Sequence, residues 1–282
     1  MRSLRLIQNE ISKEISEKLR LTSREAQIES KFILEYVLKK PYKHHLQDES
    51  FQLDENQNLL IREILDQRIQ KKPLAYIFNE WDFYGETFYL DEHVLIPRQD
   101  TELLIDLAFK KYSRDAHIHI CDLGTGSGII GITLAKHFFN SHVFVSDISE
   151  PALHVTQRNI EKFRQKNITA VHSDWYQSLP ETSFDLIISN PPYIDINDSN
   201  LNNEDLKYEP ISALFSGNKG YADIQQIINR APQYLKKAGC LMLEHGDKQN
   251  EIVQSLFHKK KFSIIEQHLD INSKIRVTSG AI

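Results

Sequence analysis

The sequence has few cysteines, no long apolar segment and no excess of basic residues, and each absence excludes a class of protein. Among its 282 residues only Cys121 and Cys240 are cysteines, too few for a disulfide framework or a cysteine metal cluster. No apolar run approaches the roughly 18–20 residues of a membrane-spanning helix, and the charged N-terminus lacks the apolar segment of a signal peptide. We therefore predict a cytoplasmic protein with no bound metal and no membrane partner.

The net charge of −5 is unevenly distributed along the chain. Residues 1–72 contain 14 Lys and Arg against 12 Asp and Glu, a net charge of +2. Residues 73–282 contain 20 against 27, a net charge of −7. Enzymes that bind duplex nucleic acid normally gain affinity from clustered cations. The charge of the longer region therefore argues against stable binding of nucleic acid.

The first 72 residues contain no glycine and a single proline, Pro41, a composition that favours helices. Apolar residues recur there at helical spacing over residues 4–19, 26–38 and 59–69. The sequence predicts a small all-α bundle over residues 1–72, with a boundary at Lys71-Lys72-Pro73.

Aromatic residues become frequent between residues 73 and 97. Residues 81–84 and 87–90 have the composition of two short strands, and Gly85 marks a turn between them. We expect residues 73–97 to form a β-hairpin that links the bundle to the rest of the chain.

Strands and helices alternate over residues 98–282, which is typical of a largely parallel sheet covered on both faces. The predicted strands cover residues 118–123, 143–146, 169–171, 184–189, 239–243, 262–268 and 274–279. Helices are predicted between them, including one over residues 222–236. The fold class is therefore α/β.

A glycine-rich loop, Gly124-Thr125-Gly126-Ser127-Gly128, directly follows the first of these strands. In an open parallel sheet, ligands bind at the carboxyl ends of strands, and glycines let a ligand approach the backbone closely. Alone, the loop is equally consistent with a tight turn. Asp147 ends the next strand, 23 residues after Gly124, where a carboxylate can accept both hydroxyls of a ribose. Together, the loop and Asp147 favour a ribose-bearing cofactor.

Asp174 and Trp175 follow the third strand. Asp174 could accept a hydrogen bond from an exocyclic amine, and Trp175 could pack on the face of an adenine. A capped loop with an aromatic plug explains the same two residues equally well.

Asn190-Pro191-Pro192-Tyr193 follows the fourth strand and is the strongest motif in the chain. The prolines remove two backbone donors, so the carbonyls of Asn190 and Pro191 and the side-chain oxygen of Asn190 are left as acceptors. Tyr193 adds a flat face. Such a set suits a planar –NH₂ group, and a rigid turn that closes the strand is the weaker alternative.

These motifs resemble those of class I S-adenosylmethionine-dependent methyltransferases that modify amino groups on planar systems. The whole chain is similar to the HemK/PrmC family, the peptide chain release factor glutamine methyltransferases. The further stretches that match this family are residues 73–77, 83–85, 96–98, 100–102, 208–210, 213–214, 243–246 and 276–277. One departure is Gln99, where the family usually has a proline.

The resemblance implies a Rossmann-like, seven-stranded methyltransferase domain over residues 98–282, preceded by the hairpin linker and by a bundle that recognises the release factor. The implied reaction methylates N5 of the glutamine in the Gly-Gly-Gln motif of release factors, which supports translation termination. The residues implied or assigned as contacts of S-adenosylmethionine are Gly124, Thr125, Gly126, Ser127, Gly128, Asp147, Asp174, Trp175 and Asn190. Those implied to hold the acceptor glutamine are Asn190, Pro191, Pro192 and Tyr193.

An amide nitrogen is a poor nucleophile because its lone pair is delocalised into the carbonyl, whereas a sulfonium methyl group is already activated. We therefore expect catalysis by positioning and electrostatics, carried by Asn190, Pro191 and Tyr193. Glu244 and His245 are a candidate base pair, but a histidine that ends a buried strand is more often structural.

Two other functions remain open. A DNA adenine-N6 methyltransferase would hold a flipped base with residues 190–193. Against it stand the acidic balance of residues 73–282 and the lack of an insertion large enough for a target-recognition domain. A non-catalytic nucleotide-binding or RNA-associated module would need the glycine loop without an acceptor site. A monomer is the simplest oligomeric state.

Overall fold

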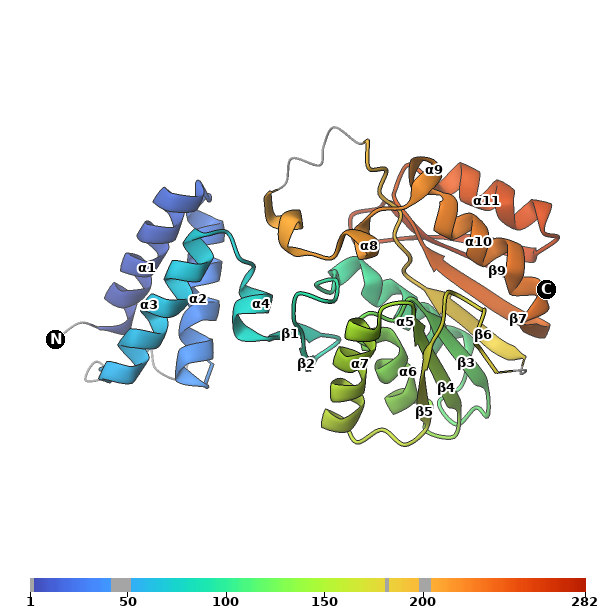
Figure 1. The fold of residues 1–282 in the computed structure, drawn as a ribbon, viewed down its shortest axis with the longest axis horizontal. Coiled ribbons are helices and arrows are strands. Elements are labelled where there is room, and N and C mark those ends of the chain that lie inside the picture. The colour runs from blue at the N-terminus through green and yellow to red at the C-terminus, as the bar shows by residue number, and fades with distance from the viewer. Residues whose placement is uncertain (1–2, 42–51, 181–182, 198–203) are drawn as a thin grey trace. The chain divides into compact units, whose positions relative to one another are not determined.

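The computed structural model describes residues 3–41, 52–180, 183–197 and 204–282. The chain divides into two compact units, Met1–Asn79 and Glu80–Ile282 (Figure 1). Within the described residues, no helix is both long enough and apolar enough to cross a membrane.

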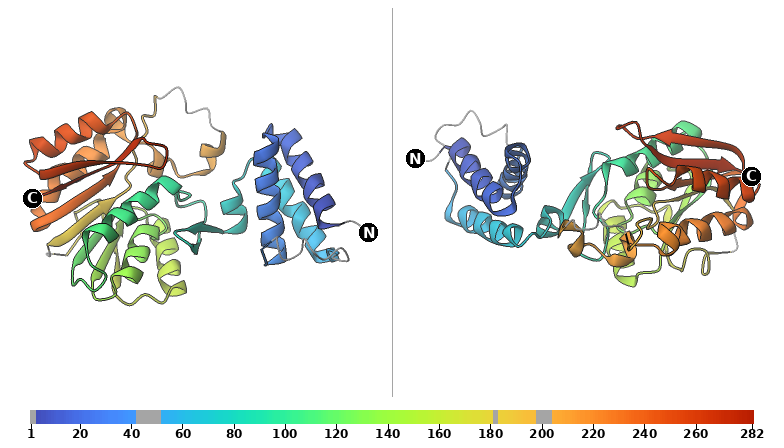
Figure 2. Two further views of the ribbon diagram at one scale, coloured as in Figure 1. Left: turned by 180° about the vertical axis from the view of Figure 1, so that it is seen from behind. Right: turned by 90° about the horizontal axis from the view of Figure 1, so that it is seen from above.

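The N-terminal unit is the helical bundle that the apolar periodicity predicts. Its long helices, α1 (Leu4–Leu19), α2 (Ser23–Leu38) and α3 (Glu55–Ile69), pack on one another (Figure 2). Capping boxes start α2 and α3, because the cap side chain and the side chain three residues later each accept the other's backbone N–H. Buried apolar side chains from all three helices form the core, including Ile11, Ile15, Ile33, Leu34, Ile61, Ile64 and Leu65.

A fourth helix extends this unit beyond the boundary predicted at residues 71–73. Helix α4 (Leu74–Phe78) buries Leu74 and Tyr76, and the ring of Phe78 stacks on that of Tyr36 with 4.2 Å between the centroids. The division between the units therefore falls after Asn79, so the first residues assigned to the hairpin linker belong to the bundle.

The C-terminal unit begins with an antiparallel hairpin of β1 (Glu80–Phe83) and β2 (Glu86–Tyr89). Tyr84 and Gly85 form its turn with positive φ values of 49° and 76°, the sign that tight hairpin turns require. Phe83 and Phe88 are buried in the same apolar core as the helices that follow, so the hairpin packs as part of this unit.

A seven-stranded sheet forms the centre of the C-terminal unit, in the order β5-β4-β3-β6-β7-β9-β8 (Figure 1). The strands are β3 (His119–Leu123), β4 (His142–Asp147), β5 (Ile168–His172), β6 (Phe184–Ser189), β7 (Leu235–Glu244), β8 (Ser263–Leu269) and β9 (Ile275–Ala281). The first five are parallel, whereas β9 lies antiparallel between β7 and β8. The predicted α/β class and the seven strands are confirmed.

Helices cover both faces of the sheet. Those on one face are α5 (Glu102–Lys111), α6 (Ile129–His137) and α7 (Glu150–Lys162), and those on the other are α10 (Ala222–Arg230) and α11 (Asn250–Lys259). Within β3, Ile120 packs in the core beneath α5, α6 and α7, whereas Cys121 and Leu123 pack in the core beneath α10 and α11. Both cysteines of the chain are buried and unpaired.

The segment between β6 and β7 differs from the prediction. It contains short helices that the apolar pattern does not indicate: η3 (Glu204–Tyr208), α8 (Ile211–Leu214) and α9 (Gly217–Gly220). The helix predicted over residues 222–236 is too long, since α10 ends at Arg230 and a one-turn 3-10 helix, Ala231–Gln233, follows. Pro232 lacks the N–H that a continuing helix would need, and β7 begins at Leu235.

Candidate active site

The predicted site residues gather at the carboxyl ends of the central strands, where β3 lies between β4 and β6. Open parallel sheets bind ligands at such a switch in strand order. A cavity of about 340 Å³ opens here, lined among others by Gly124, Thr125, Gly126, Ser127, Asp147, Asp174, Trp175, Asn190 and Pro192. Gly128, Pro191 and Tyr193 are not among its lining residues.

The three glycines of the loop, Gly124, Gly126 and Gly128, all have positive φ values, of 68°, 56° and 83°. They differ in how much space surrounds them. A Cβ on Gly124 would stand 3.2 Å from the Trp175 ring, and one on Gly128 would stand 2.9 Å from Cδ1 of Ile132. A Cβ on Gly126 would meet nothing within 4 Å. Gly124 and Gly128 therefore permit close packing, and Gly126 leaves the loop backbone open to a ligand.

Asp122 holds the loop from beneath. Its Oδ2 accepts hydrogen bonds from the Thr125 hydroxyl at 2.6 Å and from the Gly131 N–H at 3.0 Å. Its Oδ1 is buried and has no partner among the residues that the structure describes. Burial raises the pKa of Asp122 to about 7, although the two hydrogen bonds act in the opposite direction.

Asp147 lies at the cavity wall with its carboxylate oriented by backbone amides. Its Oδ2 accepts the Gly126 N–H and its Oδ1 accepts the Ser149 N–H, both at 2.9 Å. Burial raises the pKa of Asp147, and these donors oppose that shift. Because a carboxylate oxygen can accept two hydrogen bonds, each oxygen retains a position for a ligand hydroxyl.

Trp175 and Asp174 line the cavity beside the glycine loop. Trp175 has a φ of 49°, which residues other than glycine rarely adopt, and its ring lies against Gly124. It also contacts the core beneath α10 and α11. Asp174 Oδ2 accepts a hydrogen bond from Gln177 Nε2 at 2.8 Å. Trp175 therefore both packs against the core and lines the cavity, and its contact with an adenine stays a prediction.

The side-chain amide of Asn190 is held from one end only. Its Nδ2 donates to Thr101 Oγ1 at 3.1 Å, and its Oδ1 accepts no hydrogen bond from the described part of the chain. Thr101 ends a one-turn 3-10 helix, η2 (Gln99–Thr101), and it also lines the cavity. This turn forms with Gln99 in the position where the family usually has proline.

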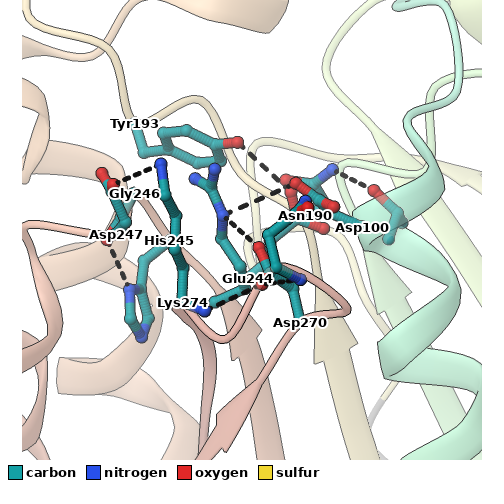
Figure 3. Close-up of polar contacts among 12 residues, drawn as sticks. Asp100, Asn190, Tyr193, Glu244, His245, Gly246, Asp247, Asp270 and Lys274 are labelled. Atoms are coloured by element: carbon teal, nitrogen blue, oxygen red, sulfur yellow. Dashed lines mark hydrogen bonds and ion pairs between the residues drawn. The ribbon is translucent and has the colours of Figure 1, made fainter.

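Glu244 is the last residue of β7, and Figure 3 shows the side chain of Tyr193 directed toward it. Its Oε1 accepts a hydrogen bond from the Tyr193 hydroxyl at 3.3 Å, whereas its Oε2 is buried and has no hydrogen-bond partner among the described residues. Burial raises the pKa of Glu244 to about 7, Asp100 acts in the same direction, and the guanidinium of Arg276 opposes it. Burial also raises the pKa of Tyr193.

His245 has a structural environment. Its Nδ1 bonds the Gly246 carbonyl at 2.9 Å and its Nε2 bonds the Thr278 hydroxyl at 2.8 Å. Burial lowers its pKa, and neither His245 nor Glu244 lines the cavity. The geometry therefore agrees with a structural histidine rather than with a base beside the acceptor.

An ion pair between Arg98 and Glu209 was not predicted. Arg98 lines the cavity and pairs with Glu209 Oε1, while Glu209 Oε2 accepts the Ile96 N–H at 3.1 Å. Glu209 is only 5% exposed. Residues 96–98 and 208–210 both match the HemK/PrmC family in sequence. No local pattern indicates that Arg98 and Glu209, which are 111 positions apart, form an ion pair. Across the described residues, no group of three or more His, Cys, Asp or Glu is arranged to hold a metal ion.

Comparisons with known proteins identify the family. Residues 10–78 match the family model for the PrmC N-terminal domain, and residues 99–205 match that for the methyltransferase small domain. A release factor glutamine methyltransferase of Buchnera aphidicola is 37% identical over 252 residues, which cover 89% of this chain and 90% of the relative. One of Haemophilus influenzae is 34% identical over 268 residues, which cover 90% and 91%. The chain belongs to the HemK/PrmC family.

Solved structures agree with this assignment at the level of the fold. A methyltransferase from Pyrococcus furiosus has a TM-score of 0.54 at 17% identity, covering 77% of this chain and 96% of its own. The 16S rRNA N2 G1207 methyltransferase of T. Thermophilus, solved with AdoMet and guanosine, has a TM-score of 0.54 at 19% identity, covering 72% and 49%. The HemK/PrmC assignment and the methyltransferase class predicted from the sequence are confirmed, in preference to the two alternative functions.

Proposed function

We propose that this chain transfers the methyl group of S-adenosylmethionine to N5 of the glutamine in the Gly-Gly-Gln motif of peptide chain release factors, and so supports translation termination. The observation that carries the proposal is the uncommitted Oδ1 of Asn190, which belongs to a residue lining the same cavity as Gly126 and Asp147. An acceptor in this place suits an amide –NH₂ group. The relatives named release factor glutamine methyltransferase support glutamine as the acceptor.

The cofactor site comprises residues 124–128 with Asp147, Asp174 and Trp175. The open backbone at Gly126 and the oriented carboxylate of Asp147 fit a ligand with a ribose. When bound, S-adenosylmethionine supplies a methyl group that its sulfonium has already activated. Asp147 would accept the ribose hydroxyls, Asp174 would accept a hydrogen bond from the adenine amine, and Trp175 would pack on the base.

The acceptor site places two oxygens around one nitrogen. Asn190 Oδ1 and the Pro191 carbonyl accept the two N–H hydrogens of the glutamine amide, while Pro192 and Tyr193 shape and support the segment. Both contacts would favour a tetrahedral nitrogen and so make its lone pair available for methyl transfer. They strengthen as positive charge develops on that nitrogen, so they stabilise the transition state more than the ground state. One of the two N–H protons of the methylated nitrogen would then pass to water, since no side chain is assigned as a base.

We assign recognition of the release factor to the helical bundle of residues 1–72. A protein substrate that docks far from the reacting nitrogen uses that binding energy to orient its glutamine. We place the enzyme in the cytoplasm, in agreement with its two unpaired cysteines, as a monomer that forms no stable complex with nucleic acid.

Transfer of labelled methyl groups to release factor, DNA and RNA in parallel reactions tests the proposal. We expect label in the release factor alone, located at the Gly-Gly-Gln glutamine by mass spectrometry and lost when that glutamine is replaced by alanine. Label on DNA adenine would establish the DNA methyltransferase instead. Cofactor binding without label in any substrate would favour the non-catalytic module.

A further inference from the structure

We propose that Thr156 is a positioning residue for the cofactor, which holds the backbone of Gly126 where that glycine orients the carboxylate of Asp147. The inference deepens the proposed function and rests on it for the cofactor site at residues 124–128. Thr156 lies on α7, is fully buried and is not among the residues that line the cavity. Its effect on a bound cofactor must therefore pass through the glycine loop.

Gly126 depends on hydrogen bonds for its conformation, because no neighbouring atom packs where a Cβ would stand. A Cβ there would meet nothing within 4 Å, and the φ of 56° lies in the left-handed region that glycine adopts freely. Fixing a glycine costs more conformational freedom than fixing any other residue. The side chains that bond the peptide groups of Gly126 therefore determine how far the loop is preorganised for a ligand.

Two side chains bond Gly126, one at its N–H and one at its carbonyl. The N–H donates to Asp147 Oδ2 at 2.9 Å, and the carbonyl accepts the Thr156 hydroxyl at 2.7 Å. Asp147 ends β4, and Thr156 lies on α7, the helix that follows β4. Loss of the Thr156 hydroxyl would free Gly126 to rotate, and would weaken its hydrogen bond to the carboxylate that is assigned to the ribose.

Asn159 holds the next carbonyl of the loop from the same face of α7, since residues three apart in a helix are neighbours. Its Nδ2 donates to the carbonyls of Ser127 and of Tyr89, both at 2.9 Å, and its Oδ1 accepts the Tyr89 N–H at 2.8 Å. Because Asn159 also anchors β2, replacing it would disturb the hairpin as well as the loop. Substitutions at Thr156 therefore test the holding of Gly126 more cleanly.

Replacements of Thr156 with and without a hydroxyl test the proposal. Thr156→Val keeps the branched shape but removes the hydroxyl, and Thr156→Ser keeps the hydroxyl. We expect calorimetry to give a Kd for S-adenosylmethionine that is raised about 10-fold in Thr156→Val and stays within about threefold of wild type in Thr156→Ser. The KM for the cofactor should rise in parallel, while kcat at saturating cofactor falls less than about threefold. A valine variant with wild-type Kd, or a serine variant as weak as valine, overturns the proposal.

Thr133→Val is the matched control. Thr133 is also buried, and its hydroxyl donates to the Ile129 carbonyl at 2.6 Å within α6. The control removes a buried hydroxyl that does not hold Gly126, so its Kd should equal that of the wild type. A rise in Kd as large as that of Thr156→Val would overturn the proposal. If Thr156→Val fails to fold, Thr156→Ser and Thr156→Ala give the same comparison, because they differ by one hydroxyl.

A spectroscopic measurement reports on the held peptide group without methyl transfer. Gly126-Ser127 is the only Gly-Ser step in the sequence, so carbonyl-labelled glycine with ¹⁵N-labelled serine gives a single NMR correlation between that carbonyl and the following amide. It should be sharp in the wild type and in Thr156→Ser, and shifted and broadened in Thr156→Val. The same position and width in all three proteins overturns the proposal. If Kd and spectra follow the expected pattern but no release factor is methylated, the proposed function fails and the positioning role of Thr156 stands.

Discussion

Replacing Asp147 with asparagine tests the cofactor site with a nearly isosteric change. Asp147 accepts one backbone N–H on each oxygen, from Gly126 and from Ser149, both at 2.9 Å. Asparagine has a single oxygen, so its –NH₂ group must face one of these donors, and the charge offered to the ribose hydroxyls is lost. Hydrogen bonds to charged groups contribute about 1.5–3 kcal/mol each. A net loss of about 2–3 kcal/mol corresponds to binding that is roughly 30- to 150-fold weaker.

Isothermal titration calorimetry with S-adenosylmethionine measures this loss directly. Glu150→Gln is the matched control, because it makes the same acid-to-amide change at the start of α7 on a side chain that is 73% exposed. Its Kd should equal that of the wild type, and thermal unfolding should show that both variants are folded. A Kd for Asp147→Asn within threefold of wild type would refute the assignment of Asp147 to the ribose.

Three further predictions concern the acceptor, the bundle and Asp122. Asn190→Ala should remain folded but lose nearly all kcat, and a variant with more than half of wild-type turnover would contradict its role. A fragment of residues 80–282 should bind cofactor with unchanged affinity but methylate intact release factor orders of magnitude more slowly. Its rate of methylation of a short glutamine peptide should fall much less. Equal losses of rate on the protein and on the peptide would exclude a recognition role for the bundle. The folded-state pKa of Asp122, about 7, lies above its ordinary value of 3.8, so the free energy of unfolding should fall as pH rises from about 4 to 7. Asp122→Asn should reduce this slope, to which Glu244 also contributes, and raise the free energy of unfolding at pH 8 by about 1–2 kcal/mol, as measured by urea denaturation at pH 5 and pH 8.

The elements that the sequence predicts well are those with a strong local signal. The strand that ends at Leu123 is a short, largely apolar segment followed directly by a glycine-rich loop, and the helix after Ser149 starts with a cap residue and a proline. The helix predicted over residues 222–236 shows where this logic fails. Its apolar residues continue into Leu235, but there they belong to a buried strand, and burial alone does not distinguish the two.

The residues of the site likewise differ in how well the sequence predicts them. The glycine loop and Asp147 are recognisable because the loop directly follows one strand, Asp147 ends the next, and each carries its own chemistry. Thr101 and Glu209 carry no such signal, because their roles come from partners far along the chain. Asn190 and Thr101 are 89 residues apart, and Arg98 and Glu209 are 111 residues apart. Only the packing of the sheet and its connections brings these pairs together.

The orientation of Asn190 shows what a motif by itself does not specify. An asparagine side chain presents an acceptor at one end and a donor at the other, and only the acceptor end suits the –NH₂ group of a glutamine. The letters Asn-Pro-Pro-Tyr are compatible with both orientations. In this chain, the nitrogen end donates to the Thr101 hydroxyl oxygen at 3.1 Å, and the oxygen end accepts no hydrogen bond from the described residues. A protein with the same four residues but without a partner for the nitrogen end of this amide would have the motif without a defined acceptor, so the motif alone would overstate its catalytic competence.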